Sequence, residues 1–448
     1  MSQVDDVAKS KWTSLFLFLI LDALQILVVS ILTLNEATPW MIGFELSQSN
    51  AIVSAGLFIG IALFQLIIVY YVSLAMLRNK MMVELYPNFV RKEGFRCKFS
   101  REDLVNWSME VAKNSGVRLD KIYVMQSPLP NAFTFSLPLV GSVLTIHSNL
   151  LDLLNPGEVR SIIAHEIGHI KNNDSFVSIF TRMPAFFVDA IYLYIYVRIG
   201  LGIATALLVQ FDLAWAGIRL IVLFGFFIIS RLVIILAHLL IQKASREAEL
   251  LADYHAAITE GTASTLNALL RLGQRVEAVT SLIEEIRWLE SLNPERAGSV
   301  GQAELMRMIS AYPLDAIDEQ NAKTMAPWVF LYTKLRHLRE VYGVNLNDEQ
   351  IISVIEPATM KLLDQRKESQ EIKAPQKAPP KPGIVDWREV DYDGDSRLSM
   401  DELNDLVSML RKNPNKYMFD SETGTNLLMI DHPDFRRRVL FLADNCKL

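Results

Sequence analysis

The sequence predicts a mainly α-helical membrane protein with about four transmembrane helices and a soluble domain. Two observations lead to this fold class. The chain of 448 residues is 51% hydrophobic with a mean hydropathy of +0.23, which is too apolar for an ordinary soluble protein of this size. Its apolar residues are also gathered in long runs, although 21% of all residues are charged. The chain therefore divides into membrane and soluble parts.

The first pair of apolar runs covers residues 12–34 and 51–77. Each run exceeds the roughly 20 apolar residues that a helix needs to cross a bilayer. Between them no Lys or Arg occurs, whereas basic residues precede and follow the pair, so the positive-inside rule places both ends in the cytoplasm. The first run contains Asp22 and Gln25 and has no small-residue cleavage site, which indicates a retained anchor rather than a signal peptide.

The second pair of apolar runs covers residues 183–210 and 218–242 and is interrupted by Asp189, Arg198 and Arg231. Ionisable groups at membrane depth usually face a cavity, a partner or the interface. One or two membrane segments fit this composition, and a buried hairpin in a soluble domain is the alternative. We favour two segments, because they return the chain to the side of the membrane from which it left.

A metal-binding motif, "AHEIGH", stands just before the second pair. Asn155 and Glu158 have the spacing of a capping box, which predicts a helix through the motif. On that helix His165 and His169 lie one turn apart on one face, with Glu166 beside them. The pattern H-E-x-x-H in a helix is typical of zinc peptidases. Two histidines alone would fit a buried polar spot equally well, so a third ligand decides between these interpretations.

The candidate third ligand follows the second apolar pair, in "SREAELLADYHAA". Glu249 and Asp253 are four residues apart and hence on one helical face, among small apolar residues. Two histidines and one glutamate form a known catalytic zinc set, and Asp253 could orient a ligand imidazole. A solvated face beside Arg246 and Glu247 is the alternative. In the zinc interpretation Glu166 takes a proton from the attacking water and returns it to the leaving amine.

These motifs together resemble the M48-family, HtpX-like integral-membrane zinc metallopeptidases. The resemblance rests on the apolar segments, "PNAFTFSLP", "AHEIGHIKNND", "EAELLAD" and "HPDFRRRVLFL". It implies a cytoplasmic gluzincin-type peptidase domain, built of a small β-sheet plus helices, with one catalytic zinc. It also implies an endopeptidase that acts on membrane or misfolded proteins in quality control, at a bacterial inner membrane with the active site facing the cytoplasm. A Ste24-like prenyl-protein protease fits less well, because that group has more apolar segments.

The resemblance also implies roles for individual residues. Asn131, Ala132 and Phe133 would border the substrate cleft, and the strand-like "SVLTIHS" after them is a further candidate to pair with substrate backbone; a surface hairpin is the alternative. Near the end of the chain, His432 would stabilise the oxyanion and Arg438 would brace the site.

About 180 residues separate Glu249 from His432, more than we expect for a compact HtpX-like domain. Residues 262–345 have helical patterns that indicate soluble helices packed on the peptidase, and the Pro- and Lys-rich residues 373–383 indicate a linker. We predict two transmembrane hairpins, at residues 1–78 and 181–242. The peptidase domain is predicted in two parts, residues 79–180 with the H-E-x-x-H helix and residues 243–363 with the third zinc ligand and the helical extension. The remaining predicted parts are the linker at 364–383, the EF-hand-like segment at 384–412 and the C-terminal peptidase segment at 413–448.

The EF-hand-like segment contains "DYDGDSRLSMDE", which fits a calcium loop except that Ser396 replaces the usual glycine at position 6. The predicted calcium ligands are Asp391, Asp393, Asp395, Arg397 (through its carbonyl), Ser399 and Glu402. An acidic solvated turn is the alternative. Because the loop precedes His432 by some 30 residues, calcium could move the segment that carries this histidine.

The remaining composition bounds the function. A net charge of −6 and a sequence pI near 5.8 argue against nucleic acid as a partner. The two cysteines, Cys97 and Cys446, have no metal-site spacing and are expected as free thiols. Expected partners are polypeptide substrates, chiefly membrane proteins, and the lipid bilayer, and the oligomeric state stays open. A catalytically idle, calcium-sensing membrane scaffold is the alternative function, which the presence of Glu166 disfavours.

Overall fold

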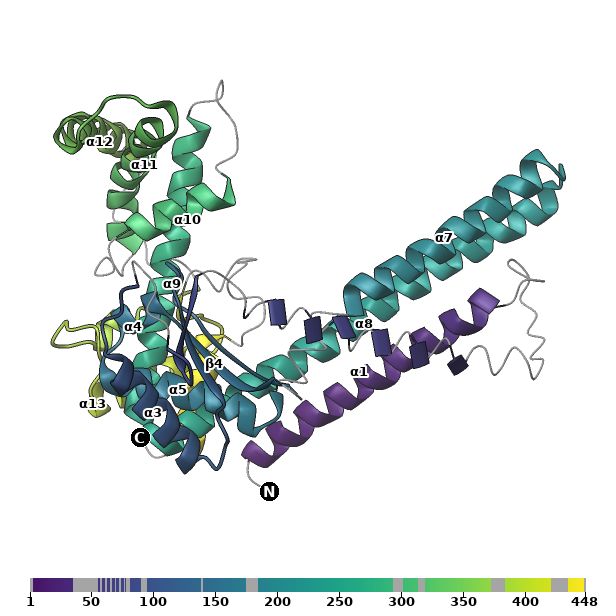
Figure 1. Ribbon diagram of the computed structural model, residues 1–448, viewed down its shortest axis with the longest axis horizontal. Helices are drawn as coiled ribbons and strands as arrows, with labels where there is room; N and C mark the ends of the chain where they lie inside the picture. The colour runs from purple at the N-terminus through teal and green to yellow at the C-terminus, as the bar shows by residue number, and fades with distance from the viewer. Residues whose placement is uncertain are drawn as a thin grey trace. The chain divides into compact units, whose positions relative to one another are not determined.

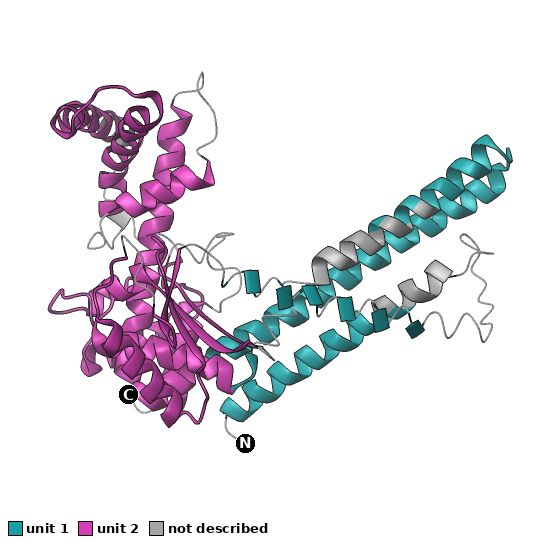
Figure 2. Ribbon diagram, in the orientation of Figure 1, with its two compact units in different colours: residues 1–79, 172–251 teal, residues 80–171, 252–448 magenta. Residues whose placement is uncertain are grey.

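The computed structural model describes residues 3–34, 81–89, 95–137, 140–174, 184–292, 301–312, 319–371, 383–419 and 434–446, with short stretches between 55 and 77. These residues are mostly helical and contain one four-stranded sheet (Figure 1). The prediction of a mainly helical chain with a small sheet is thereby confirmed. The chain forms two compact units, residues 1–79 with 172–251 and residues 80–171 with 252–448 (Figure 2).

The first unit contains long apolar helices where the sequence predicts them. They are α1 (Gln3–Leu34), α7 (Pro184–Leu208) and most of α8 (Leu213–Glu260). Within the described residues, α8 is the one helix long and apolar enough to cross a membrane. Its side chains Ile221 and Phe224 are 72% and 66% exposed, which an apolar surrounding would accommodate. The predicted segment at 51–77 lies largely outside the described residues, so four membrane segments stay a prediction.

A buried ion pair fastens α1 within this unit. The ammonium group of Lys11 donates to the carboxylate of Asp174 at 2.6 Å and to the backbone carbonyl of Asn172 at 3.0 Å. The side chains of Lys11 and Asp174 are only 1% and 5% exposed. Buried charges are stable only when they are paired and hydrogen-bonded, as these are. The N-terminal part of α1 is therefore fixed to the chain just after the H-E-x-x-H helix.

The second unit contains the sheet, which is mixed. Its strands are β1 (Met82–Tyr86), β2 (Lys121–Met125), β3 (Ala132–Leu137) and β4 (Gly141–His147), in the spatial order β1-β2-β4-β3. Strands β2 and β4 run parallel, and the other two pairings are antiparallel. Strand β3 is consequently an edge strand whose outer backbone groups face away from the sheet.

One prediction about this sheet is wrong. The segment "SVLTIHS" forms most of β4, which pairs with β2 on one side and with β3 on the other. Both backbone edges of β4 are therefore used within the sheet, and it has none to offer a substrate. Strand order depends on long-range pairing and is not visible in the local sequence. Only β3 can accept an added strand on this side of the sheet.

The H-E-x-x-H helix, α5 (Pro156–Lys171), packs against the sheet and is capped as predicted. The carboxylate of Glu158 accepts from the Asn155 backbone N–H, and the Asn155 side chain accepts from the Glu158 backbone N–H, both at 2.9 Å. This reciprocal arrangement satisfies two backbone donors at the helix start. Fully buried Ile163 and Ile167 of α5 join Leu144 of β4 in the core and so orient the helix.

The helical extension comprises α9 (Thr262–Ser291), α10 (Gln302–Ala311), α11 (Glu319–Tyr342) and α12 (Asp348–Glu371). The first half of α9 contacts α5, and its second half forms a core with α10 and α11. Residues 364–371, which the sequence assigned to the linker, belong to α12. They are mostly good helix formers, and the first proline of the linker comes only at Pro375.

The C-terminal part packs on the other face of the first half of α9. It consists of a 3₁₀ helix (Trp387–Val390), α13 (Met400–Lys412) and α14 (Phe435–Asn445). Leu266, Leu269 and Leu270 of α9 form one buried core with residues of these elements and with Phe419, which lies between α13 and α14 in the sequence. Opposite Phe419, α9 carries Gly273, and a side chain there would overlap the phenylalanine ring.

We expect Gly273→Ala to destabilise the second unit. A Cβ atom at this position falls inside the contact distance of the Phe419 ring, which is itself fully buried and cannot move aside. Overpacking of this kind costs about 1–3 kcal/mol, more than the roughly 1 kcal/mol that alanine gains over glycine in a helix. Thermal unfolding of the detergent-solubilised protein measures the difference.

The matched control is Gly225→Ala in α8, where a Cβ atom meets nothing within 4 Å. Its melting temperature should stay the same or rise, since only the helix propensity changes. Equal melting temperatures for wild type and Gly273→Ala would contradict the packing described for α9 and Phe419.

Candidate metal centre

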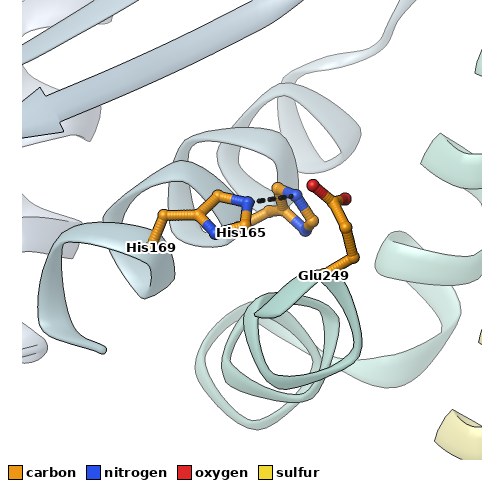
Figure 3. Close-up of side chains that lie close together, drawn as sticks. All are labelled: His165, His169 and Glu249. Carbon is orange, nitrogen blue, oxygen red and sulfur yellow. Dashed lines mark hydrogen bonds between the residues drawn. The ribbon is translucent and has the colours of Figure 1, made fainter. Parts of the chain in front are cut away.

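Three of the predicted ligands meet in the structure. His165 and His169 lie one turn apart on α5, and their Nε2 atoms are 3.1 Å apart with the two rings edge to face. Glu249 of α8 points its carboxylate toward them (Figure 3). One ligand atom of each residue lies within 4.8 Å of the others. The sequence prediction that these three side chains come together is in agreement with this geometry.

The chemistry and spacing of this donor set fit zinc. Two imidazole nitrogens and one carboxylate form an established set of zinc ligands. Two nitrogens that each bond zinc at about 2.0–2.1 Å in a tetrahedral arrangement stand about 3.3 Å apart, close to the separation found between the two histidines. His165 and Glu249 are each 8% exposed, so the donor atoms are largely shielded from bulk water.

Asp253 connects His165 to the C-terminal helix. The Nδ1 atom of His165 lies 2.9 Å from one carboxylate oxygen of Asp253. The guanidinium of Arg438, on α14, donates to both oxygens of the same carboxylate at 2.7 Å. Burial by itself raises the pKa of Asp253, but the charge and hydrogen bonds of Arg438 and His165 outweigh it and hold the pKa below its ordinary value. An ionised Asp253 keeps the proton of His165 on Nδ1 and leaves Nε2 as the ligand atom.

Glu166 has a partner that the sequence analysis missed. The hydroxyl of Thr134, on β3, lies 3.1 Å from the carboxylate oxygen Oε2 of Glu166 and 3.0 Å from its backbone carbonyl oxygen. Glu166 is 6% exposed. The two-residue period of a strand could have placed Thr134 on the same face of the strand as Ala132. It could not have revealed that this face packs against Glu166.

The predicted substrate-binding residues lie at the start of the edge strand. The exposed Asn131 accepts a hydrogen bond from His147 through its backbone carbonyl at 2.9 Å. Phe133 packs edge to face on the ring of His147, at 6.2 Å between ring centroids. Phe133 and Ala132 are half-buried. Their position on the open strand is compatible with contact to an added strand, and this role stays a prediction.

Close packing of α5 against the end of α8 involves two further residues that were missed. A Cβ atom on Gly168 would come within 3.1 Å of Ala252 and of His255, so the glycine permits the close approach of the two helices. His255, beyond the apolar run of α8, shares a hydrogen bond of 2.9 Å with the Ser115 hydroxyl. Burial, and to a smaller extent the nearby charge of Lys171, lowers the pKa of His255 to about 4. His255 is therefore neutral near pH 7 and serves packing.

The predicted calcium loop has part of the expected geometry. Carboxylate oxygens of Asp391, Asp393 and Asp395 lie within 4.8 Å of one another. Ser396 has φ of +61°, so it adopts the left-handed conformation that position 6 requires despite not being glycine. The carboxylate of Glu402, however, accepts backbone N–H groups of Tyr392 and Ser399 at 2.8 and 2.7 Å. With the Ser399 side chain it forms the capping box of α13.

The loop is attached to the start of α5. Arg397 donates from its Nε atom to the carboxylate of Glu158 at 2.8 Å, and Glu158 is 2% exposed. Asn267 of α9 pairs with the backbone of Leu398 in both directions, at 2.7 and 2.9 Å. Arg397 therefore has a structural contact through its side chain in addition to the carbonyl role predicted for it.

The late histidine motif is only partly described. His432, the predicted oxyanion donor, lies outside the described residues. Helix α14 begins just after it, with Asp434 as the N-cap that accepts from the Arg437 backbone N–H at 2.7 Å. This cap fixes the helix start, and Arg438 follows within the first turn.

Comparison with known proteins agrees with this site. Residues 100–293 match the model of Peptidase family M48. A protease HtpX homolog of Aeropyrum pernix is 28% identical over 191 residues, which cover 40% of this chain and 54% of that protein. A protease HtpX homolog of Methylacidiphilum infernorum is 26% identical over 194 residues, which cover 41% and 59%.

A shorter match is closer in sequence: a protease HtpX homolog of Thermoplasma volcanium is 44% identical over 68 residues, which cover 15% of this chain and 22% of that protein. The matched part of the chain covers about half the length of the first two relatives and less of the third. No solved structure matches significantly. The match over residues 100–293 contains the two histidines, Glu249 and Asp253. Residues 100–293 therefore form a peptidase family M48 domain, and the chain is similar to protease HtpX homologs over part of its length.

Proposed function

We propose that this chain is a zinc-dependent endopeptidase that cleaves membrane or misfolded proteins. The observation that carries the proposal is the group of His165, His169 and Glu249 with Glu166 directly beside it. A set of metal ligands can persist in a binding protein, whereas a buried glutamate in this position has a purpose chiefly in catalysis. This consideration favours an enzyme over the idle scaffold.

The residues around the site divide the chemical work. Zinc bound by His165, His169 and Glu249 would supply Lewis-acid chemistry, which lowers the pKa of water and polarises a carbonyl group. Glu166 then accepts the proton of the attacking water and delivers it to the leaving amine. Asp253 holds the imidazole of His165 in the orientation that directs Nε2 to the metal.

Substrate binding is proposed at the open edge of β3. A peptide in extended conformation can add to this edge by backbone hydrogen bonds, next to Asn131, Ala132 and Phe133. The same strand carries Thr134, which touches Glu166, so an added peptide would lie near the catalytic base. His432 is proposed as a donor to the oxyanion, in line with the family resemblance.

Membrane attachment is proposed through four helical segments, with the peptidase on the cytoplasmic side of a bacterial inner membrane. Helix α8 supports it by its length and apolar composition. The distribution of Lys and Arg around residues 12–77 supports the orientation. The H-E-x-x-H helix and Glu249 then lie on the same side of the membrane, because the two segments of the second apolar pair carry the chain across and back.

Calcium binding at residues 391–402 is a subsidiary proposal. The grouped oxygens of Asp391, Asp393 and Asp395 and the left-handed Ser396 support it. The present hydrogen bonds of Glu402 to backbone N–H groups oppose it, since a bidentate calcium ligand would have to give them up. Arg397 would transmit any change in the loop to Glu158 at the start of α5.

Glu166→Gln should abolish cleavage and leave the metal in place. The amide has nearly the shape of the carboxylate but cannot accept the proton of the attacking water, so we expect kcat/KM to fall by about 10³-fold or more. Cleavage of casein or a model membrane protein in mild detergent, together with zinc content, gives both measurements. One zinc per chain in both proteins with cleavage by wild type alone is the expected result.

A matched control is Glu158→Gln, which changes a buried glutamate on the same helix but away from the metal ligands. It should retain its zinc and most of its activity. If wild type and Glu166→Gln both bind zinc and neither cleaves the substrate, even after calcium has been added, the result would support the idle scaffold instead.

Arg438→Met should destabilise the protein and weaken zinc binding. It leaves the carboxylate of Asp253, which is fully buried, without its cationic partner, and breaking a buried pair typically costs about 3–5 kcal/mol. The unpaired carboxylate also ceases to orient His165, so zinc affinity should fall by about 10–100-fold. Thermal unfolding and competition with a zinc chelator measure the two effects.

Arg437→Met is the control for this change, because Arg437 is the neighbouring arginine on α14 and its side chain is exposed. Its melting temperature and zinc affinity should match those of wild type. If Arg438→Met behaves in the same way, Arg438 does not brace the site.

Calcium titration by calorimetry tests the loop. We expect binding in the presence of physiological Mg²⁺ for wild type and its loss in Asp391→Asn with Asp393→Asn, because each carboxylate contributes negative charge to the ion. Asp401→Asn, an exposed aspartate on α13 outside the predicted ligands, is the control. The absence of a binding signal in wild type would leave an acidic turn before α13.

A further inference from the structure

We propose that Thr134 is a positioning residue that holds the carboxylate of Glu166 in its working orientation. The inference rests on the proposed peptidase function, because it concerns the base of that reaction. Its starting point is the position of one hydroxyl between two oxygens of the same residue. The Thr134 hydroxyl is 3.1 Å from the Glu166 carboxylate and 3.0 Å from the Glu166 backbone carbonyl.

A threonine hydroxyl has one proton to donate and lone pairs with which to accept. While Glu166 is ionised, the hydroxyl can donate to the carboxylate oxygen Oε2. A hydrogen bond to a charged group is stronger than a neutral one, so it holds the carboxylate in one rotamer. The base is thereby kept in place before water is deprotonated.

The same hydroxyl lies within hydrogen-bond distance of the Glu166 backbone carbonyl as well. Thr134 therefore connects strand β3 to both the side chain and the main chain of Glu166 on α5. Because Glu166 is 6% exposed, little water is available to replace the hydroxyl as a partner of the carboxylate.

The strand keeps this hydroxyl in position. Thr134 pairs with Leu144 in the register of β3 and β4, and Leu144 is fully buried in the core. Threonine is branched at Cβ, which restricts the rotation of its side chain further. The hydroxyl therefore belongs to a rigid part of the sheet, whereas its acceptors belong to α5.

The test compares Thr134→Val with Thr134→Ser. Valine keeps the shape and strand propensity of threonine but has no hydroxyl, whereas serine keeps the hydroxyl. We expect kcat of Thr134→Val to fall about ten-fold or more with KM within about two-fold of wild type, and Thr134→Ser to keep kcat within about three-fold. Zinc content should be that of wild type in both, since neither change touches a ligand.

Thr145→Val is the matched control. Thr145 lies on the neighbouring strand β4 and is fully buried, and its hydroxyl has no hydrogen-bond partner among the described residues. Removing this hydroxyl should leave kcat and KM unchanged. A similar fall in kcat for Thr145→Val and Thr134→Val would show that any loss of a hydroxyl from the sheet slows the reaction, and would overturn the proposal.

A second measurement does not depend on activity. Thermal unfolding of Thr134→Val, Glu166→Met and the double variant forms a cycle that reports the contact itself. We expect the melting-temperature shift of the double variant to be smaller than the sum of the two single shifts. Thr134→Ala, which also lacks the hydroxyl, replaces Thr134→Val in the cycle and in the assay if the valine variant does not fold.

The outcomes separate the two proposals. Additive melting-temperature shifts, or a wild-type kcat in Thr134→Val, would overturn the role of Thr134 while leaving the peptidase intact. A wild type that binds zinc but cleaves no substrate would refute the proposed function. That result would also refute the role of Thr134 in positioning a catalytic base, even if the unfolding cycle detects the contact between Thr134 and Glu166.

Discussion

The buried carboxylate of Asp253 is the constraint on which the candidate site depends. It is fully buried, and an anion in such a place is stable only with a cation and hydrogen bonds around it. Arg438 supplies the cation through two hydrogen bonds of 2.7 Å, and His165 supplies a further contact. Asp253 is on α8, Arg438 on α14 and His165 on α5. One ion pair therefore requires three distant parts of the sequence to come together beside the metal ligands.

This requirement explains how the long insertion is accommodated. The chain departs from the site after Asp253 and must return with Arg438, although the helical extension and the loop at 391–402 lie between them. Helix α9 makes both possible, because its first half packs on α5 and on the C-terminal helices while its second half forms the separate core of the extension. The extension can consequently fold without entering the metal site. A clash at Gly273 would act on this shared helix rather than on the ligands.

Sequence patterns predicted the parts of the site that follow helical spacing. His165 and His169, and likewise Glu249 and Asp253, are four residues apart, so a helix alone puts each pair on one face. Thr134 has no such signature, because a hydroxyl residue in a strand is ordinary and its contact with Glu166 depends on how β3 packs on α5. The place of "SVLTIHS" inside the sheet was missed for the same reason. Its neighbours β2 and β3 are set by long-range pairing.

The loop at 391–402 shows how one carboxylate can serve two different structures. Both oxygens of Glu402 accept backbone N–H groups without any cation. The hydrogen bond from Ser399 belongs to the capping box that stabilises the start of α13, and the one from Tyr392 fixes the loop. Bidentate calcium ligation would use the same two oxygens. The left-handed conformation of Ser396 suits the calcium loop, but it is already present with the capping box formed. The backbone of the loop is thus compatible with either state, and the choice between them lies in the hydrogen bonds of Glu402.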